Sequence, residues 1–174
     1  MGFKTHSLTL LRHAKSDWSR ESLSDHDRPL NERGERDAPQ MGKRLKALGV
    51  RPSLLVTSTA KRAVQTCKLV ANNLGFPLEF IHRERDLYLA SPQQIMRTLA
   101  QQDPSFHHVL LVGHNPGISE LAQRLSDGLV VDMPTAAMLT VEGETPDWAS
   151  FEQIARRVVG YDYPKNHAGV ITRQ

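Results

Sequence analysis

The sequence has little of what several protein classes require. It contains one cysteine, Cys67, so an intramolecular disulfide is excluded and a zinc site built on cysteines is disfavoured. Aromatic residues make up only 6% of the chain, and its 22 Lys and Arg form no basic block, which argues against a nucleic-acid partner. The apolar runs are a few residues long, whereas a membrane helix needs about 20. We therefore expect no membrane segment.

Several catalytic and ligand-binding motifs are also missing. No GxxxxGK[ST] loop and no GxGxxG turn occurs, which removes the commonest nucleotide-binding loops. The GxSxG elbow of serine hydrolases is absent. Neither HExxH nor paired His or Cys at ligand spacing is found, so we predict no metal and no cofactor. The start, MGFKTHS, has no apolar signal core, which predicts a cytoplasmic protein.

What remains is the composition of an ordinary globular protein, with 39% hydrophobic and 24% charged residues. A length of 174 residues matches one domain, and no repeat or linker divides the chain. We therefore predict a single domain over residues 1–174. The formal net charge is +3, and the scattered basic residues suit a small anionic ligand held by a few placed arginines.

Hydrophobic periodicity and turn residues predict alternating strands and helices. The predicted strands are 7–11, 54–56, 78–81 at an edge, 109–112 at the centre, 136–141 and 156–161. The predicted helices are 31–48, 59–74, 91–102 and 118–125, while 17–29 is irregular and 164–174 is a polar tail. Strands separated by helices of this length indicate βαβ crossovers. We predict an α/β fold, a three-layer α/β/α sandwich with a mostly parallel central sheet.

Basic side chains follow three of the predicted strands. Arg12 and His13 end the first strand, Arg62 lies shortly after the second, and His114 follows the central one. In open α/β sheets the ligand crevice lies beyond the carboxyl ends of the strands. Each residue alone has a simple explanation as a solvated cation or a histidine bonded to backbone. Three strand ends with anion-binding groups are better explained by one shared anion site.

This set of side chains suits phosphoryl transfer. A guanidinium binds phosphate oxygens bidentately, and the free N–H groups at a helix start face the same anion. A neutral imidazole in the correct tautomer is a competent nucleophile toward phosphorus. A second imidazole can stabilise charge on the phosphoryl oxygens, and nearby cations lower the pKa of the nucleophile.

Three ordered motifs resemble a known family. They are Arg12-His13-Ala14 with Lys15-Ser16, Ser58-x-x-x-Arg62-Ala63-x-x-Thr66, and Val112-Gly113-His114-Asn115-Pro116. The chain resembles the histidine phosphatase superfamily, the phosphoglycerate-mutase-like group, whose signature is an RHG or RHA triplet ending the first strand. Within it, RHAKSDW, DRPLNERG and Asp86-Leu87-Tyr88-x-Ala90 are most similar to the compact SixA-type phosphohistidine phosphatases.

The resemblance implies a phosphoglycerate-mutase-like fold and a two-step reaction. His13 would attack phosphorus, and water would discharge the resulting phosphohistidine. Arg12, Arg62 and His114 would hold the phosphoryl group through both steps.

Other positions matched by the resemblance have competing interpretations. Ser16 and Asn115 are candidate phosphate ligands, but a loop serine bonded to its own backbone and an Asn-Pro turn are alternatives. The family's usual glutamate acid is matched by Asp86, which is one methylene shorter and is alternatively a solvated turn residue. Asp25, Asp27 and Arg28 border the pocket mouth or, as we favour, form a solvated loop.

A general acid with a short side chain, or the lack of a general acid, favours one substrate class. The imidazole that leaves a phosphoramidate needs less protonation than the alkoxide of a sugar phosphate. The short connection after the third strand leaves no room for a lid, and an open pocket suits a phosphorylated protein, such as a histidine phosphotransfer domain of a signalling phosphorelay. The alternatives are a phosphatase on small phosphate esters and a non-catalytic phosphate-binding module.

Overall fold

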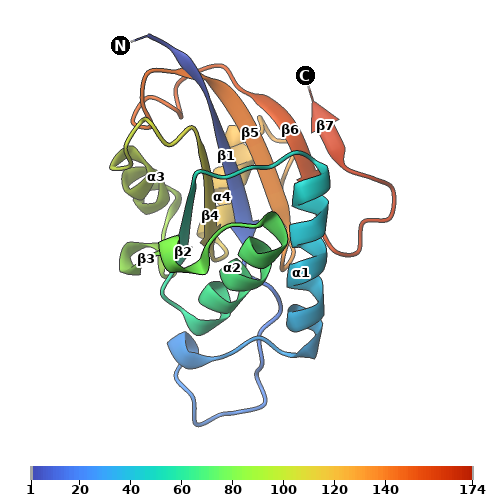
Figure 1. Cartoon of the computed structure of the whole chain (residues 1–174). Coiled ribbons are helices and arrows are strands. Elements are labelled where there is room, and N and C mark those ends of the chain that lie inside the picture. The colour runs from blue at the N-terminus through green and yellow to red at the C-terminus, as the bar shows by residue number, and fades with distance from the viewer. Residues whose placement is uncertain (1, 174) are drawn as a thin grey trace.

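The computed structural model describes residues 2–173, which form one seven-stranded sheet with helices on both faces (Figure 1). The strands are β1 (Lys4–Arg12), β2 (Leu54–Ser58), β3 (His82–Glu84), β4 (His108–Gly113), β5 (Met138–Thr145), β6 (Arg157–Asp162) and β7 (Ile171–Arg173). Their order is β3-β2-β4-β1-β5-β6-β7. The first four pair in parallel, and β5, β6 and β7 pair antiparallel. Since β6 is antiparallel to β5 and thus parallel to β1, most strands point one way, which confirms the predicted sheet.

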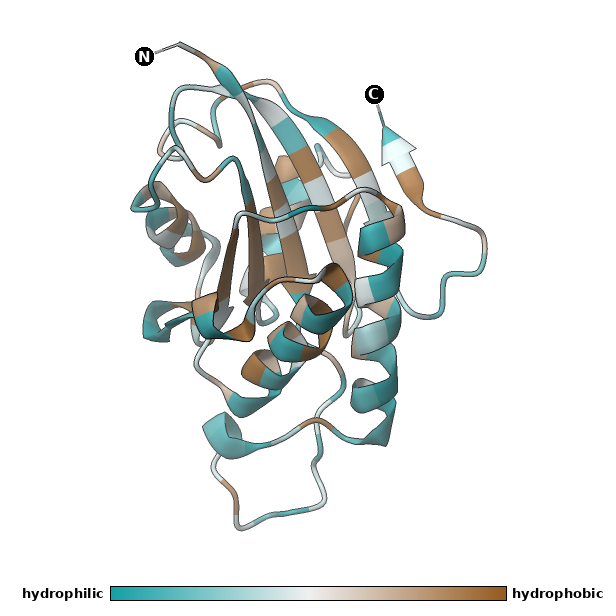
Figure 2. Ribbon diagram, viewed as in Figure 1, coloured by the Kyte–Doolittle hydropathy of each residue, from teal (hydrophilic) through white to brown (hydrophobic). Residues whose placement is uncertain are grey.

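The helices are α1 (Glu32–Ala47), α2 (Lys61–Leu74), α3 (Pro92–Ala100) and α4 (Gly117–Leu125). Leu8 and Leu10 of β1 pack with α3 and α4, whereas Leu11 packs with α1 and α2 on the opposite face. This alternation is the period of two that a strand imposes on its side chains. Apolar residues concentrate on the sheet and on the inward sides of the helices (Figure 2). The three-layer prediction is confirmed.

Local signals explain where the helices begin and end. The Asn31 side chain accepts a hydrogen bond from the Gly34 N–H at 2.9 Å and caps α1. Ser91 and Gln94 form a capping box at the start of α3. Gly75 ends α2 at a φ of 70°, a conformation that glycine adopts without strain. The α2 helix begins at Lys61, two residues later than predicted, and has Ala60 as its N-cap.

Two predicted segments were wrong. Residues Leu78–Phe80 form a 3-10 helix, η2, and the edge strand is the polar His82–Glu84 beside it. An edge strand needs only one hydrogen-bonded neighbour, here β2, so it can form without an apolar pattern. The polar tail is not fully irregular, because Ile171–Arg173 pairs with β6 as β7; Gln174 lies outside the described residues. The predicted central strand, β4, is interior, but β1 occupies the middle of the sheet.

The layers bring the carboxyl ends of β1, β2 and β4 to one edge, at the bottom of Figure 1, where the loop 17–29 lies. The start of α1 packs closely on this edge. A Cβ placed on Gly34 would lie 2.2 Å from the Lys15 carbonyl oxygen, two residues after His13. Within residues 2–173, no helix is both long and apolar enough to cross a membrane.

Gly34→Ala tests this close approach. We expect it to lower the free energy of unfolding by about 1–3 kcal/mol, because the Lys15 backbone must move to admit a methyl group. Without that contact, alanine in a helix would be stabilising by up to about 1 kcal/mol. Urea unfolding measures the change, with Gly2→Ala as control, since no atom lies within 4 Å of a Cβ there. A stabilised Gly34→Ala protein would contradict the packing.

Candidate active site

A cavity of about 200 Å³ opens at the carboxyl edge of the sheet. It is lined by Arg12, His13, Lys15, Ser16, Trp18, Arg28, Arg62, Leu89, His114, Asn115 and Thr135. The structure therefore brings together the two arginines and two histidines that the sequence places at three separate strand ends. The cavity is smaller than the pockets of drug-sized ligands, which start at about 300 Å³, and its size suits one phosphoryl group.

His13 is held in one tautomer directly after β1. Its Nδ1 is 2.8 Å from the Ala14 carbonyl oxygen, and because a carbonyl only accepts, Nδ1 carries the proton. The other nitrogen, Nε2, keeps its lone pair. Burial, together with the charges of His114, Arg62 and Arg12, lowers the pKa of His13 to about 3. His13 is therefore neutral near pH 7 and has the form that a nucleophile requires.

His114 lies beside His13, with ring centroids 5.1 Å apart. An Arg62 N–H donates to its Nδ1 at 3.4 Å, so the proton is on Nε2, which lies 2.7 Å from Ser58 Oγ. Burial and the Arg62 charge lower the pKa of His114 to about 3. Both histidines are thus neutral and buried against guanidinium groups.

The two arginines retain unused hydrogen-bond donors. Arg12 donates to the Met133 carbonyl oxygen at 2.9 Å, and Arg62 donates to the Asp25 carbonyl oxygen at 2.7 Å. The Nε–H groups of Arg12 and Arg62 are buried without an acceptor. A buried donor without a partner is costly, and an anion in the cavity would supply the acceptor.

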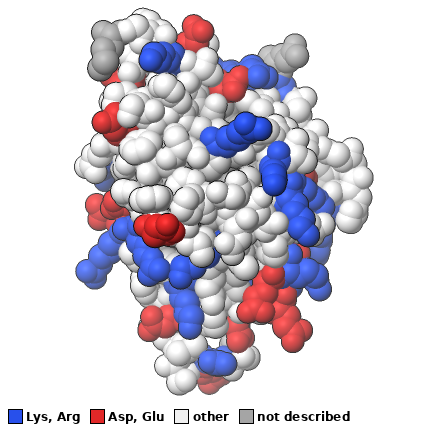
Figure 3. Space-filling view, in the orientation of Figure 1, with Lys and Arg blue, Asp and Glu red and all other residues white. Residues whose placement is uncertain are grey.

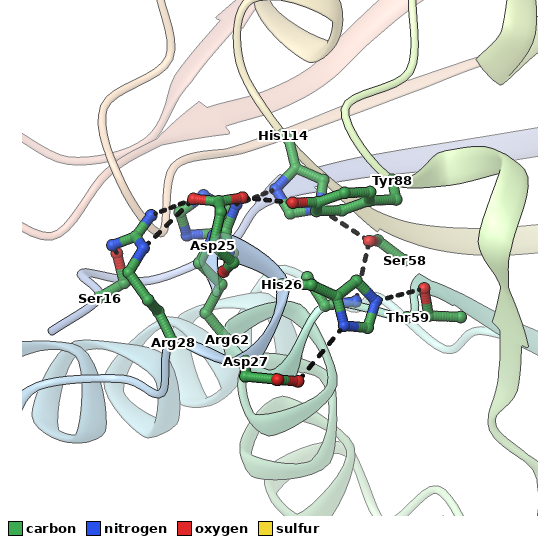
Figure 4. Close-up of polar contacts among 12 residues, drawn as sticks. Ser16, Asp25, His26, Asp27, Arg28, Ser58, Thr59, Arg62, Tyr88 and His114 are labelled. Carbon is green, nitrogen blue, oxygen red and sulfur yellow. Dashed lines mark hydrogen bonds and ion pairs between the residues drawn. The ribbon is translucent and has the colours of Figure 1, made fainter. Parts of the chain in front are cut away.

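A carboxylate that our sequence interpretation assigned to a solvated loop organises this cluster (Figure 4). Asp25 accepts hydrogen bonds from Arg62 at 3.0 Å, from Arg28 at 2.8 and 3.2 Å, and from the Tyr88 hydroxyl. Desolvation raises the pKa of Asp25, but these hydrogen bonds outweigh it and hold the pKa well below its usual range. Asp25 therefore stays ionised and fixes Arg28 and Arg62, which both line the cavity.

Other residues around this cluster differ in their roles. Arg28 is 7% exposed and its guanidinium lies 3.5 Å from the centroid of the Trp18 ring. Asp27 instead contacts Ser24 and His26, away from the arginines. Tyr88, which bonds Asp25, has no predicted role of its own and stands in the sequence as part of the Asp86-Leu87-Tyr88-x-Ala90 motif. Arg28 stands in DRPLNERG, and these are the two short motifs that resemble SixA-type proteins. The place of Arg28 and Tyr88 in these motifs is the signal that could have identified them as site residues.

The remaining predicted ligands lie at different places. Ser16 is buried in the cavity wall, and its Oγ accepts a hydrogen bond from Arg28 at 2.8 Å. Asn115 also lines the cavity, but its amide N–H groups donate to Asp132 and to the Met133 carbonyl, and its oxygen accepts from Ser119. The Asn115 amide is thus engaged in holding the segment that also binds Arg12.

Asp86, the candidate acid, is exposed on the 3-10 helix η3 (Arg85–Leu87) and is not among the residues that line the cavity. None of those lining residues carries a carboxyl group. Within residues 2–173, no group of three or more His, Cys, Asp or Glu side chains is placed to hold a metal ion.

The fold and this cavity define a protein with a small, arginine-lined cavity beside a neutral histidine. The family model described as histidine phosphatase superfamily (branch 1) matches residues 8–115, and the chain belongs to this superfamily. Its phosphoglycerate-mutase-like fold is of the SixA type. Family and fold together support a phosphatase, that is, a hydrolase of phosphoryl groups.

Individual proteins are similar to this chain in sequence or in fold. An uncharacterized chloroplastic protein of Arabidopsis thaliana is 33% identical, covering 79% of this chain and 67% of that protein. The putative phosphohistidine phosphatase SixA of Agrobacterium tumefaciens is 26% identical with a TM-score of 0.76, covering 91% of this chain and 98% of its own. The putative SixA of Nakamurella multipartitia shares the fold, with a TM-score of 0.79, 24% identity, and coverage of 95% and 100%.

The buried neutral histidines predict a stability that depends on pH. The pKa of His13 and His114 is about 3 in the folded protein, compared with 6.5 for a free histidine. Between these values the unfolded chain binds more protons, so the free energy of unfolding falls as the pH falls from about 7 toward 3. Each histidine contributes at most about 1.4 kcal/mol per pH unit.

Urea unfolding between pH 7 and pH 5 measures this slope. We expect His114→Asn to flatten it in part, because one histidine titration is removed, whereas those of His13 and of His108, whose pKa burial lowers to about 4, remain. His167→Asn is the control, since His167 is exposed in the segment before β7. A slope that is unchanged in His114→Asn would contradict the assignment of His114 as a buried neutral group.

Proposed function

We propose that this protein hydrolyses phosphohistidine on a partner protein through a phosphoenzyme formed on His13. The observation that carries the proposal is the state of His13: Nδ1 is bonded to the Ala14 carbonyl, and the free Nε2 belongs to a ring held beside His114 in a cavity lined by Arg12 and Arg62. A module that only binds phosphate needs the arginines but has no use for a neutral imidazole in a fixed tautomer.

The reaction follows in two balanced steps. In the first, His13 Nε2 attacks phosphorus, and the bond from phosphorus to the substrate imidazole nitrogen breaks. The bond electrons stay with the leaving imidazole, which takes a proton from solvent. In the second, water attacks the phosphorus on His13, and the bond from phosphorus to Nε2 breaks with its electrons left on Nε2. Inorganic phosphate, which keeps the protons of the water, leaves, and the neutral histidine is restored. The unused Nε–H donors of Arg12 and Arg62 would hold the phosphoryl oxygens in both steps.

The lining of the cavity supports a phosphoramidate substrate over a phosphate ester. No carboxyl group lines the cavity, and Asp86 is exposed outside it. An alkoxide leaving group needs a proton from a nearby acid, whereas an imidazole leaves with less assistance. Asp86 remains a candidate acid only if it approaches when a substrate binds.

The rim of the cavity supports a protein as the substrate. Trp18 and Leu89 line the cavity and are 69% and 55% exposed. Large apolar side chains beside a polar cavity are typical of a surface that contacts another protein. Basic and acidic residues are mixed over the face in Figure 3, as on an ordinary protein surface. The SixA proteins that share this fold are described as phosphohistidine phosphatases, which agrees with this substrate class.

Trapping the phosphoenzyme tests the nucleophile. Mixing the protein with a histidine domain that carries radioactive phosphate and quenching in alkali should give a labelled, acid-labile phosphoprotein. We expect His13→Ala to lose this label and to lower turnover by more than about a thousandfold, as when a covalent nucleophile is removed. His167→Ala, an exposed histidine, is the matched control. Undiminished turnover in His13→Ala would contradict the proposed mechanism.

A substrate panel tests the substrate class. We expect kcat/KM for a phosphorylated histidine domain to exceed that for sugar phosphates and nucleotides by at least about tenfold, because those esters require protonation of an alkoxide. Phosphate release is measured for each substrate at equal enzyme concentration. Faster turnover of the small esters would instead assign a small-ester phosphatase, and phosphate binding without turnover of any substrate would assign a binding module.

A further inference from the structure

A second cavity of about 160 Å³ adjoins the active site. It is lined by Arg33, Asp37, Pro134, Thr135, Tyr163, Pro164 and Lys165. Thr135 lines both cavities and so forms a shared wall. The next residue, Ala136, donates its N–H to the His13 carbonyl oxygen at 3.1 Å. This wall is therefore fixed directly to the backbone of the nucleophile.

Arg33, in the first turn of α1, has one buried N–H group without a hydrogen-bond acceptor, although its side chain as a whole is 41% exposed. One of its terminal N–H groups donates to Thr135 Oγ1 at 3.2 Å. Its Nε–H is buried without an acceptor and forms only a 3.6 Å ion pair with Asp37. Within residues 2–173, the buried side-chain polar atoms without a hydrogen-bond partner are the Nε atoms of Arg12, Arg62 and Arg33. Two of these three arginines line the phosphoryl cavity, and the third lines its neighbour.

The charge of the second cavity also favours an anion. Lys165 lines it together with Arg33. Its one carboxylate, Asp37, is shared between Arg33 at 3.6 Å and Arg36 at 4.0 Å, so it does not neutralise the cavity. Tyr163, Thr135 and two prolines supply the rest of the lining, so the basic groups outnumber the carboxylate in this cavity.

We propose that Arg33, Thr135 and Lys165 form a second anion-binding subsite, which selects substrates that carry an anionic group beside the phosphoryl group. The inference rests on the proposed function, because the phosphoryl group anchors the substrate in the first cavity. The second anion is a carboxylate or phosphate that reaches past Thr135. It comes either from an acidic side chain near phosphohistidine in a protein or from a second acidic group of a small molecule.

Binding of phosphonates tests the subsite without requiring turnover. The probes are benzylphosphonates with a carboxylate at the ortho, meta or para position, each paired with the carboxamide of the same shape. Calorimetry on the full chain gives the Kd of each probe. We expect at least one carboxylate to bind about tenfold more tightly than its carboxamide, the effect of one charge-assisted hydrogen bond.

Matched variants connect this preference to Arg33. Arg33→Gln should reduce the carboxylate-to-carboxamide ratio to about one, and Lys165→Gln should reduce it in part. Arg36→Gln is the control, because Arg36 is 71% exposed on the same helix turn and does not line the cavity. Since Lys165 is exposed, its variant is expected to fold even if Arg33→Gln does not.

The outcomes separate this inference from the phosphatase proposal. Equal binding of every carboxylate and carboxamide in the wild-type protein, or an unchanged ratio in both Arg33→Gln and Lys165→Gln, overturns the subsite and leaves the His13 mechanism intact. Failure to trap a phosphoenzyme overturns the mechanism, while the phosphonate ratio still reports the subsite. If no phosphonate binds, the subsite is overturned, because the first cavity then does not hold the phosphoryl group that anchors the substrate.

A pair of phosphohistidine peptides distinguishes the two sources of the second anion. One peptide has Glu and the other has Gln two residues from the phosphohistidine. A kcat/KM preference of about tenfold for the Glu peptide, lost in Arg33→Gln, supports an acidic side chain as the source. A preference that is confined to the benzylphosphonates supports a small molecule with two acidic groups.

Discussion

The structure depends on holding guanidinium groups out of water beside two neutral histidines. Burial of an unpaired donor disfavours the folded state, so such groups persist only where the surrounding fold fixes them. Here β1 supplies Arg12 and His13, α2 supplies Arg62, and the segment after β4 supplies His114. The cations and burial together keep both imidazoles neutral, and a bound phosphoryl group would satisfy the donors that the protein leaves open.

A carboxylate beside the cavity, Asp25, offsets this concentration of positive charge. Asp25 is bonded to Arg28, Arg62 and Tyr88, so the loop 17–29 is anchored to α2 rather than free in solvent. The same loop leads into α1, whose start packs on the Lys15 carbonyl through Gly34. The segment that follows the nucleophile is therefore tied to α1 and α2, and such support is what precise positioning of a catalytic group requires.

The sequence predicted the layers, the parallel part of the sheet and the helices because these depend on local periodicity and on turn residues. It failed at the sheet edges. The polar strand β3 and the short β7 form through pairing with a neighbour, which leaves no apolar pattern of their own. For the site, the sequence placed Arg12, His13, Arg62 and His114 at strand ends but assigned Asp25 and Arg28 to a solvated loop. Arg28 is buried against Ser16, and Asp25, though exposed, is bonded to Arg62 of α2; local patterns do not encode these contacts.

The sequence by itself determined which chemical groups stand at the carboxyl ends of β1, β2 and β4, because parallel strands must end at a common edge. Only the tertiary structure decided the protonation and tautomer of His13 and His114, the exposure of Asp86, and the contact between Arg33 and Thr135, which lie 102 positions apart. These properties depend on burial and on partners from distant segments, and such partners are fixed only when the layers pack.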